Sequence, residues 1–108
     1  MIGLSQTQQK MYQNLEAGDF KARFESAEKA ELLDVRTEGE FQFGTISGAR
    51  NINILSPTFL GEISKLDREK EYFVFCRSGA RSAQACSLLS REGFTAYNLL
   101  GGIEEWAD

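Results

Sequence analysis

Short apolar runs bounded by charged or turn-forming residues recur along the chain. Glu71 precedes four apolar residues rich in aromatic side chains, and Ala30 opens a compact run centred on Leu32, Leu33 and Val35. Runs of this length without polar–apolar alternation are typical of strands buried on both faces of a parallel sheet. The pattern predicts strands at 11–15, 30–36, 49–54, 72–75 and 96–99.

Apolar residues at helical spacing occupy the segments between these strands. We expect a helix over Asp19–Glu28, with a turn and cap at Gly18 and Asp19. A second helix is expected to begin at Ser56 and Pro57. Serine there caps free N–H groups, and proline at the first helical position has no N–H to satisfy.

A helix-starting turn is also expected after the strand at 30–36. Thr37 suits the N-cap, and Glu40 stands three residues later in the capping-box position. Phe41 and Phe43 follow, and we expect them to anchor this turn to the core.

The last helix precedes the strand at 96–99 and stops at Gly93, after which Phe94 can pack on Leu89 in a Schellman arrangement. Strands that alternate with helices predict an α/β fold, with a central parallel sheet of about five strands flanked by helices on both faces. A chain of 108 residues suits one domain. We place this domain at residues 11–108, after a polar N-terminal preface at 1–10.

Composition and charge narrow the function classes. The formal net charge of −4 argues against a nucleic-acid partner. Apolar runs are too short for a membrane span, and the first residues lack the layout of a signal peptide, so we expect a cytoplasmic protein. The chain contains no histidine and two cysteines. An ordinary zinc site and a Cys–His pair are therefore excluded, and we expect neither metal nor cofactor.

Cys76 stands where the predicted strand at 72–75 meets a short basic loop and then a helix. Backbone N–H groups converge at such a turn and, with the positive end of the helix dipole, attract anions. A thiol in that place ionises more readily than a free cysteine. Without histidine, its activation has to come from backbone dipoles and from Arg77 and Arg81. The competing interpretation is an inert buried cysteine at a strand end.

Several motifs carry a family resemblance. They read LLDVR at 32–36, EF at 40–41, GTISGA at 44–49, CRSGARS at 76–82 and GGIEEW at 101–106. In this order and spacing the chain resembles a single-domain rhodanese, a sulfurtransferase, from about Leu15 onward. Thr45 and Ser47 depart from the pattern, since family members often have histidine and proline at these positions.

The resemblance implies a rhodanese-like α/β domain that moves a sulfane sulfur from a small anionic donor such as thiosulfate to cyanide or a thiol. Cys76 is then the nucleophile that forms a persulfide. The cradle for the outer sulfur and the donor consists of Arg77, Ser78, Gly79, Ala80 and Arg81. A protein is a further candidate acceptor of the sulfur. The alternative is a persulfide carrier or a partner-docking module with little free turnover.

Two spacings bear on this chemistry. Four residues lie between Cys76 and Arg81, whereas the related loop of cysteine-dependent phosphatases is one residue longer because phosphate is larger than a sulfur atom. Sulfur transfer is therefore favoured over phosphate-ester hydrolysis. Cys86 lies on the order of 10 Å farther along the helix, at about 1.5 Å per residue. A disulfide needs Cα atoms within about 7 Å, so Cys86 is expected to be a small core residue.

Charged residues outside the loop are expected to support it. For Asp34 and Arg36, we expect a structural role at least as much as a catalytic one. Arg36 is expected to pair with Glu40, and Asp34 to hydrogen-bond near the Cys76 loop. Ile103 and Trp106 follow the last strand. They either border the pocket or, as we favour for Trp106, close the core.

Overall fold

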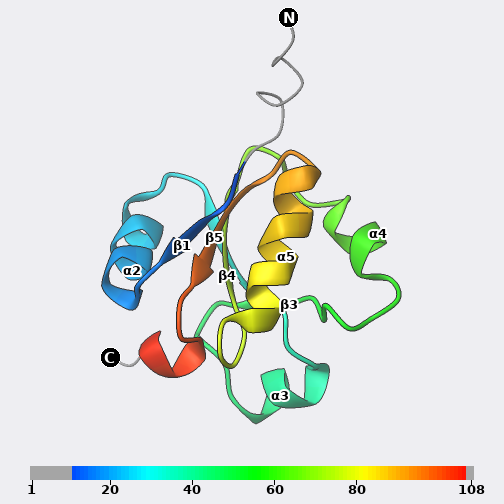
Figure 1. Ribbon diagram of the computed structural model, residues 1–108, viewed down its shortest axis with the longest axis horizontal. Helices are drawn as coiled ribbons and strands as arrows, with labels where there is room; N and C mark the ends of the chain where they lie inside the picture. The colour runs from blue at the N-terminus through cyan, green and yellow to red at the C-terminus, as the bar shows by residue number, and fades with distance from the viewer. Residues whose placement is uncertain (1–10, 107–108) are drawn as a thin grey trace, which may run out of the picture.

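The computed structural model describes residues 11–106. The predicted polar preface at 1–10 and residues 107–108 lie outside the described residues. Helices and strands alternate along the chain (Figure 1). The elements are β1 (Gln13–Leu15), α2 (Ala17–Ser26), β2 (Ala30–Asp34), α3 (Glu38–Phe43), β3 (Arg50–Asn51), α4 (Phe59–Ile63), β4 (Glu71–Phe75), α5 (Ala80–Arg91), β5 (Thr95–Leu99) and a final 3₁₀-helix (Ile103–Trp106).

The strands form a five-stranded parallel sheet in the order β1-β5-β4-β2-β3, which confirms the predicted fold. β4 lies at the centre and pairs with β2, from Glu71 opposite Ala30 to Phe75 opposite Asp34. The carboxyl ends of all strands meet at one edge, at the bottom of Figure 1. The predicted strand at 49–54 is shorter in the structure, where β3 spans two residues, although the N–H groups of Ile52 and Ile54 still donate to the carbonyls of Asp34 and Val35.

Helices cover both faces of the sheet, as predicted (Figure 1). Along β4, Tyr72 and Val74 belong to the core shared with α4 and α5. Phe73 and Phe75 belong to the core on the other face, shared with α2 and the 3₁₀-helix. All four side chains are fully buried, as a central parallel strand requires. Among residues 11–106, no helix is long and apolar enough to cross a membrane.

Phe73 lies at the centre of an aromatic cluster. Its ring stacks on Tyr97 with centroids 4.7 Å apart, and meets Phe20 and Phe24 edge-on at 5.4 and 5.5 Å. Trp106 packs edge-on against the same two phenylalanines at 6.0 and 6.4 Å. Such pairs contribute about 0.5–1.5 kcal/mol each beyond the area that they bury. The prediction that Trp106 closes the core is confirmed.

Two helices begin at residues other than those predicted. α2 begins at Ala17, before the predicted cap at Asp19. α4 begins at Phe59 rather than at the Ser–Pro pair. The Ser56 hydroxyl accepts the N–H of Thr58 at 3.1 Å, so it stabilises a turn ahead of the helix instead of the helix itself.

The capping box of α3 is confirmed. Thr37 Oγ1 accepts the N–H of Glu40 at 3.2 Å, and a Glu40 carboxylate oxygen accepts the N–H of Thr37 at 3.0 Å. The prediction that Phe43 anchors this turn in the core is wrong, because 96% of Phe43 is exposed. Phe41 is half-buried. α3 is short and contains no buried residue, so its aromatic side chains are not required by the core.

The end of α5 also matches the prediction. Gly93 has a φ of +90°, and the N–H of Phe94 donates to the carbonyl of Leu89 at 3.0 Å. The N–H of Gly93 donates to the carbonyl of Ser90 at 3.0 Å. These two bonds define a Schellman motif, and Phe94 packs in the same core cluster as Leu89.

Candidate active site

Cys76 directly follows β4, at the edge where the carboxyl ends of the strands meet. A three-residue loop, 77–79, separates it from the first residue of α5. Gly79 is the N-cap of that helix and has a φ of +102°, a left-handed conformation that favours glycine. The turn directs the first N–H groups of α5 back toward Cys76, whose side chain is fully buried.

The Cys76 sulfur accepts three hydrogen bonds. They come from the N–H of Gly79 at 3.1 Å, the N–H of Ser82 at 3.3 Å and the hydroxyl of Ser82 at 3.3 Å. Burial raises the pKa of the Cys76 thiol. The two donors of Ser82, with the N–H groups of Gly79 and Ser78, outweigh burial and bring this pKa below its ordinary value. The thiolate is therefore favoured, as nucleophilic sulfur chemistry requires.

Ser82 lies outside the predicted cradle of residues 77–81, and the structure adds it to the site. The first N–H groups of a helix have no partner within the helix and are free to bind another acceptor. α5 begins at Ala80, so the N–H and hydroxyl of Ser82 fall in its first turn, over Cys76. A serine in the first turn of the predicted helix is the sequence signal that could have identified Ser82 as part of the site.

The backbone after β5 supports the Cys76 loop. The N–H of Ile103 donates to the carbonyl of Cys76 at 2.9 Å. Gly102 has a φ of +84°, and a Cβ atom at this position would lie 1.8 Å from the carbonyl oxygen of Arg77. Only glycine allows such a close approach of the two backbones. Gly102 belongs to the GGIEEW motif that carries part of the family resemblance, but its contact with the Cys76 loop was not predicted.

Arg81 points to α3 and not to the sulfur. Its guanidinium binds Glu40 through two hydrogen bonds of 2.8 and 3.0 Å. This pairing with Arg81, with the hydrogen bonds from Thr37, lowers the pKa of Glu40 to about 2. The same pairing raises the pKa of Arg81. Arg81 therefore ties the first turn of α5 to the capping box of α3.

Arg36 does not take the partner that the sequence predicted. Its guanidinium binds Asp34 with hydrogen bonds of 2.9 and 2.7 Å and also donates to the carbonyl of Gly44 at 2.6 Å. Its hydrogen bond to Asp34 raises the pKa of Arg36. The expected Arg36–Glu40 pair is thus wrong, because each residue binds a different partner.

Asp34 is fully buried and also accepts the hydroxyl of Thr45 at 2.8 Å. Its side-chain hydrogen bonds go to the segment that follows β2 and to the segment between α3 and β3. Asp34 lies opposite Phe75, next to Cys76, but none of these bonds goes to the loop itself. Thr45, one of the two departures from the family pattern, is exposed, and its hydroxyl binds the buried carboxylate of Asp34 from the surface.

The remaining cradle residues lie at the surface of the loop. Arg77, Ser78 and Ala80 are exposed, and Gly79 is half-buried. Within the described part of the chain, the Arg77 side chain forms no ion pair. It is the guanidinium of the loop that is available to an anion.

Cys86 lies one turn of α5 beyond Ser82 and is fully buried. Burial raises the pKa of its thiol, and the nearby Cys76 sulfur raises it further. Both cysteines are free thiols. The expectation that Cys86 is a small core residue is confirmed by its place in the core cluster beneath α5.

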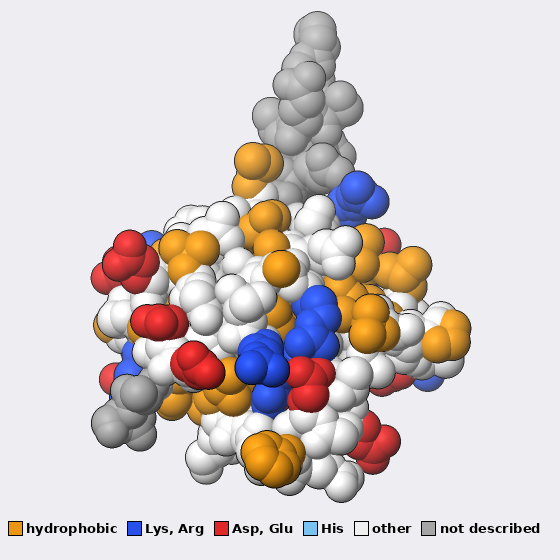
Figure 2. Space-filling view, turned by 60° about the horizontal axis from the view of Figure 1, so that its bottom comes forward, with side chains coloured by type: hydrophobic (Ala, Val, Ile, Leu, Met, Phe, Trp, Pro, Cys, Tyr) orange, Lys and Arg blue, Asp and Glu red, His pale blue; other side chains and the backbone are white. Residues whose placement is uncertain are grey.

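A cleft of about 520 Å³ lies beside the Cys76 loop. Three of its lining residues come from α3, one from the Cys76 loop and two from the final 3₁₀-helix, and Arg36 completes the set. They are Gly39, Glu40, Phe43, Arg77, Ile103, Glu104 and Arg36. Figure 2 shows the face at the carboxyl ends of the strands, with basic side chains gathered near its centre and acidic ones beside them. Arg77 follows Cys76, and Ile103 binds its carbonyl, so the cleft adjoins the sulfur site.

The chain belongs to the rhodanese-like domain family, whose family model matches residues 8–108. A sulfurtransferase from Allochromatium vinosum is 35% identical over 99 residues, which cover 90% of this chain and 90% of that protein. The putative sulfur carrier protein YrkF of Bacillus subtilis is 33% identical over 92 residues, covering 81% of this chain and 46% of that protein.

Solved structures agree with this assignment. A rhodanese-related protein from Thermoplasma volcanium superposes with a TM-score of 0.76 at 34% sequence identity, covering 88% of this chain and 90% of that one. The family resemblance and the rhodanese-like fold that the sequence predicted are therefore confirmed. The relatives support sulfur transfer as the general chemistry of the chain.

Proposed function

We propose that this protein is a sulfurtransferase that carries a sulfane sulfur as a persulfide on Cys76. The observation that supports this most is the convergence of three hydrogen-bond donors on the Cys76 sulfur. These hydrogen-bond donors favour the thiolate that attacks the sulfur donor, and hydrogen bonds of this kind would also stabilise negative charge on the outer sulfur of a persulfide.

In the first step the Cys76 thiolate attacks the outer sulfur of thiosulfate. The S–S bond of thiosulfate breaks, sulfite leaves with the bonding electron pair, and a Cys76 persulfide anion forms. In the second step cyanide or a thiolate attacks the outer sulfur. The Cys76–sulfur bond breaks, Cys76 returns to the thiolate, and thiocyanate or an acceptor persulfide is released.

The first step brings a thiolate and a dianion together, so positive charge is needed near the sulfur. Arg77 lies next to Cys76 and is exposed, so it is suited to bind the donor. Arg81 is already bound to Glu40, so its part is to position α5 and, at a distance, to offset negative charge on Cys76. The sequence pattern assigned anion binding to both arginines. In this proposal Arg77 binds the sulfur donor, and Arg81 acts through α5.

The alternative is a carrier that accepts sulfur and relays it to a partner with little free turnover. Two observations favour it: Cys76 is fully buried, and one relative is a putative sulfur carrier. Both functions use the same Cys76 persulfide. They differ in whether small acceptors discharge it rapidly.

Intact-mass analysis after incubation with thiosulfate tests the shared step, and thiocyanate release on adding cyanide tests turnover. We expect one added sulfur on the wild type, lost on adding cyanide, and none on Cys76→Ser. The matched control is Cys86→Ala, which keeps an apolar side chain in the core and should retain uptake. A persulfide with negligible thiocyanate turnover would favour the carrier. Equal sulfur uptake by the wild type and Cys76→Ser would contradict both functions.

A further inference from the structure

Asn98 is a buried polar residue on the inner strand β5. Only 1% of it is exposed, and it pairs in register with Asn14 of β1 on one side and Val74 of β4 on the other. Val74 belongs to the core on the face that α5 covers. Because side chains in register on neighbouring strands share one face of a sheet, the Asn98 side chain lies on this face too, beneath α5.

The Asn98 amide joins the sheet to the Cys76 loop. Its nitrogen donates to the carbonyl of Gly79 at 3.3 Å and to the side-chain oxygen of Asn14 at 2.9 Å. A backbone carbonyl can only accept, so the contact with Gly79 requires the nitrogen end of the amide to face the loop. Gly79 is also the residue whose N–H donates to the Cys76 sulfur at 3.1 Å. A single residue therefore links the amide to the sulfur.

Gly79 needs an outside contact to hold its conformation. It has a φ of +102°, and glycine has more backbone freedom than any other residue. Its carbonyl also accepts the N–H of Ala83 at 3.1 Å, but that bond lies within the first turn of α5 and moves with the helix. Asn98, in contrast, is fixed in the sheet by strands on both sides. Its amide therefore fixes Gly79 relative to β4, at whose end Cys76 lies.

The other end of the amide argues against a purely stabilising role for Asn98. Its Oδ1 atom is buried and has no hydrogen-bond partner among residues 11–106. A buried polar atom without a partner destabilises the folded state. The neighbours of Asn98 on this face, Ala96 along the strand and Val74 across it, are apolar members of the core. Asparagine at this position is therefore better explained by its bond to the Cys76 loop than by core packing.

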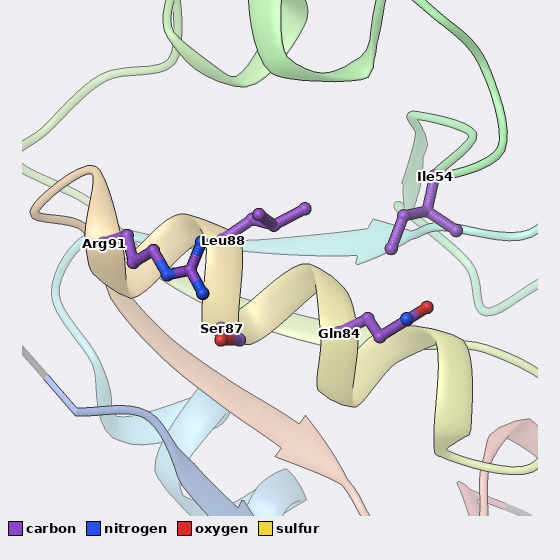
Figure 3. A pocket seen from close by; sticks show the side chains of 5 residues that line it. All are labelled: Ile54, Gln84, Ser87, Leu88 and Arg91. Carbon is purple, nitrogen blue, oxygen red and sulfur yellow. The ribbon is translucent and has the colours of Figure 1, made fainter.

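The remaining surroundings of α5 hold its start less directly. The helix packs mainly on β5 and β4. A hollow of about 450 Å³ lies between the helix and the segment after β3 (Figure 3). It is lined by Ile54, Gln84, Ser87, Leu88 and Arg91. At the start of the helix, Arg81 binds Glu40 of the short helix α3, and the Asn98 amide ties the same turn to the sheet.

We propose that Asn98 is a positioning residue of the sulfur site. Its amide holds the Gly79 carbonyl and thereby keeps the Gly79 N–H directed at the Cys76 sulfur. Asn98 acts through Gly79 and not on the sulfur itself. The thiolate of Cys76 depends on these N–H groups, so loss of the amide makes the thiolate less available. The consequence for sulfur uptake rests on the proposed persulfide function.

Asn98→Leu tests this role, because leucine has a similar size but neither the donor to Gly79 nor the unpartnered oxygen. The Gly79 carbonyl keeps the N–H of Ala83, so we expect the fold to be retained. Alkylation of Cys76 by iodoacetamide is followed by mass over a range of pH. We expect its midpoint to rise by about half a pH unit or more, as partial loss of one hydrogen bond to the sulfur requires. Sulfur uptake from thiosulfate at pH 7 should slow about threefold or more for the same reason.

The matched control is Tyr97→Phe. Tyr97 precedes Asn98 on β5, and its hydroxyl bonds with Arg23 and Glu71 while its ring packs in the core on the other face of the sheet. Its loss should leave both the alkylation midpoint and the rate of sulfur uptake unchanged. Urea denaturation measures the stability of every variant, and midpoints are compared where each is folded. Asn98→Ala, which removes the same amide, replaces the leucine variant if leucine prevents folding.

An alkylation midpoint equal to that of the wild type in the Asn98 variant would overturn this inference and leave the proposed function standing. An equal shift in Tyr97→Phe would overturn it too, since any lost hydrogen bond on β5 would then have the same effect. Failure of the wild type to take up sulfur would overturn the proposed function. The alkylation midpoints would then still decide whether Asn98 positions the donors to Cys76.

Discussion

Cys76 is subject to two opposing effects. Its burial penalises the charged thiolate, whereas hydrogen-bond donors stabilise that charge. The donors outweigh burial because Ser82 supplies two of them and the backbone of the loop supplies the others. No histidine is available in the chain. A general base is therefore replaced by fixed dipoles around the sulfur.

The first prediction concerns the Ser82 hydroxyl. Ser82→Ala removes one donor to the Cys76 sulfur but keeps the backbone N–H. The pKa of Cys76 should rise, so the midpoint of the pH dependence of its alkylation by iodoacetamide should move to higher pH. A hydrogen bond to a charged group contributes about 1.5–3 kcal/mol, so sulfur uptake at pH 7 should fall about tenfold or more.

Ser78→Ala is the control, since Ser78 lies in the same loop and supplies a backbone N–H that the substitution keeps. Its alkylation midpoint should match that of the wild type. An unchanged midpoint in Ser82→Ala would show that the hydroxyl does not stabilise the thiolate.

Between elements, Glu40 links two helices. One carboxylate accepts the Thr37 N–H in the capping box of α3 and both hydrogen bonds from Arg81 in the first turn of α5. The orientation of α5 at the sulfur therefore depends on a short helix that buries none of its own residues. The phenylalanine at the end of that helix is left to face the cleft.

The second link between elements is the contact of Gly102 with the loop backbone. Gly102→Ala would place a Cβ atom 1.8 Å from the Arg77 carbonyl oxygen. We expect the loop to be displaced, sulfur uptake to fall more than tenfold, and the unfolding free energy to drop by about 3 kcal/mol or more from strain and overpacking. Intact mass after thiosulfate and urea denaturation measure the two effects.

Gly101→Ala is a close control. Gly101 has a similar φ of +81°, but its added Cβ would meet the flexible Glu105 side chain, which can move. It should lower the unfolding free energy by only about 1–2 kcal/mol and keep most of the sulfur uptake. Equal losses of uptake in the two variants would argue that backbone strain, and not the contact with the loop, is responsible.

The elements were predictable from local patterns, and their contacts were less so. The run before Cys76, the capping box at Thr37 and the stop at Gly93 are written in neighbouring residues, and the structure has all three. The partner of Glu40 is not local. Both Arg36 and Arg81 could pair with Glu40 on the evidence of the sequence, and only the placement of α3 beside the start of α5 selects Arg81.

Side-chain direction was a second source of error. Phe43 reads as a core residue because it is a large aromatic, but α3 is a six-residue helix that buries none of its residues. Ile103 was among the residues considered for the border of the pocket, and it does line the cleft, but Phe43 was not, because the two come from segments far apart in the sequence.

At the scale of the whole molecule, most of the core lies away from the sulfur, although Cys76 itself belongs to the core cluster on one face of the sheet. The buried apolar side chains lie above and below the sheet, with Phe73 at the centre of the aromatic cluster on one face. The cleft and the Cys76 loop lie at the carboxyl edge of the same sheet. Core substitutions far from Cys76 should therefore leave sulfur uptake largely unaffected when the fold is retained.

The same substitution, phenylalanine to alanine, at a core position and at an exposed position tests whether core stability and sulfur uptake are separate. Phe73→Ala removes a fully buried ring that contacts three other aromatic rings, so it should lower the unfolding free energy by about 3–5 kcal/mol. Phe43→Ala removes a ring that is 96% exposed and should change it by less than about 0.5 kcal/mol. Urea denaturation measures both. At a temperature where each variant is folded, both should still take up sulfur from thiosulfate. A Phe43→Ala variant destabilised by several kcal/mol would mean that Phe43 is packed against the fold, contrary to its exposure in the structure.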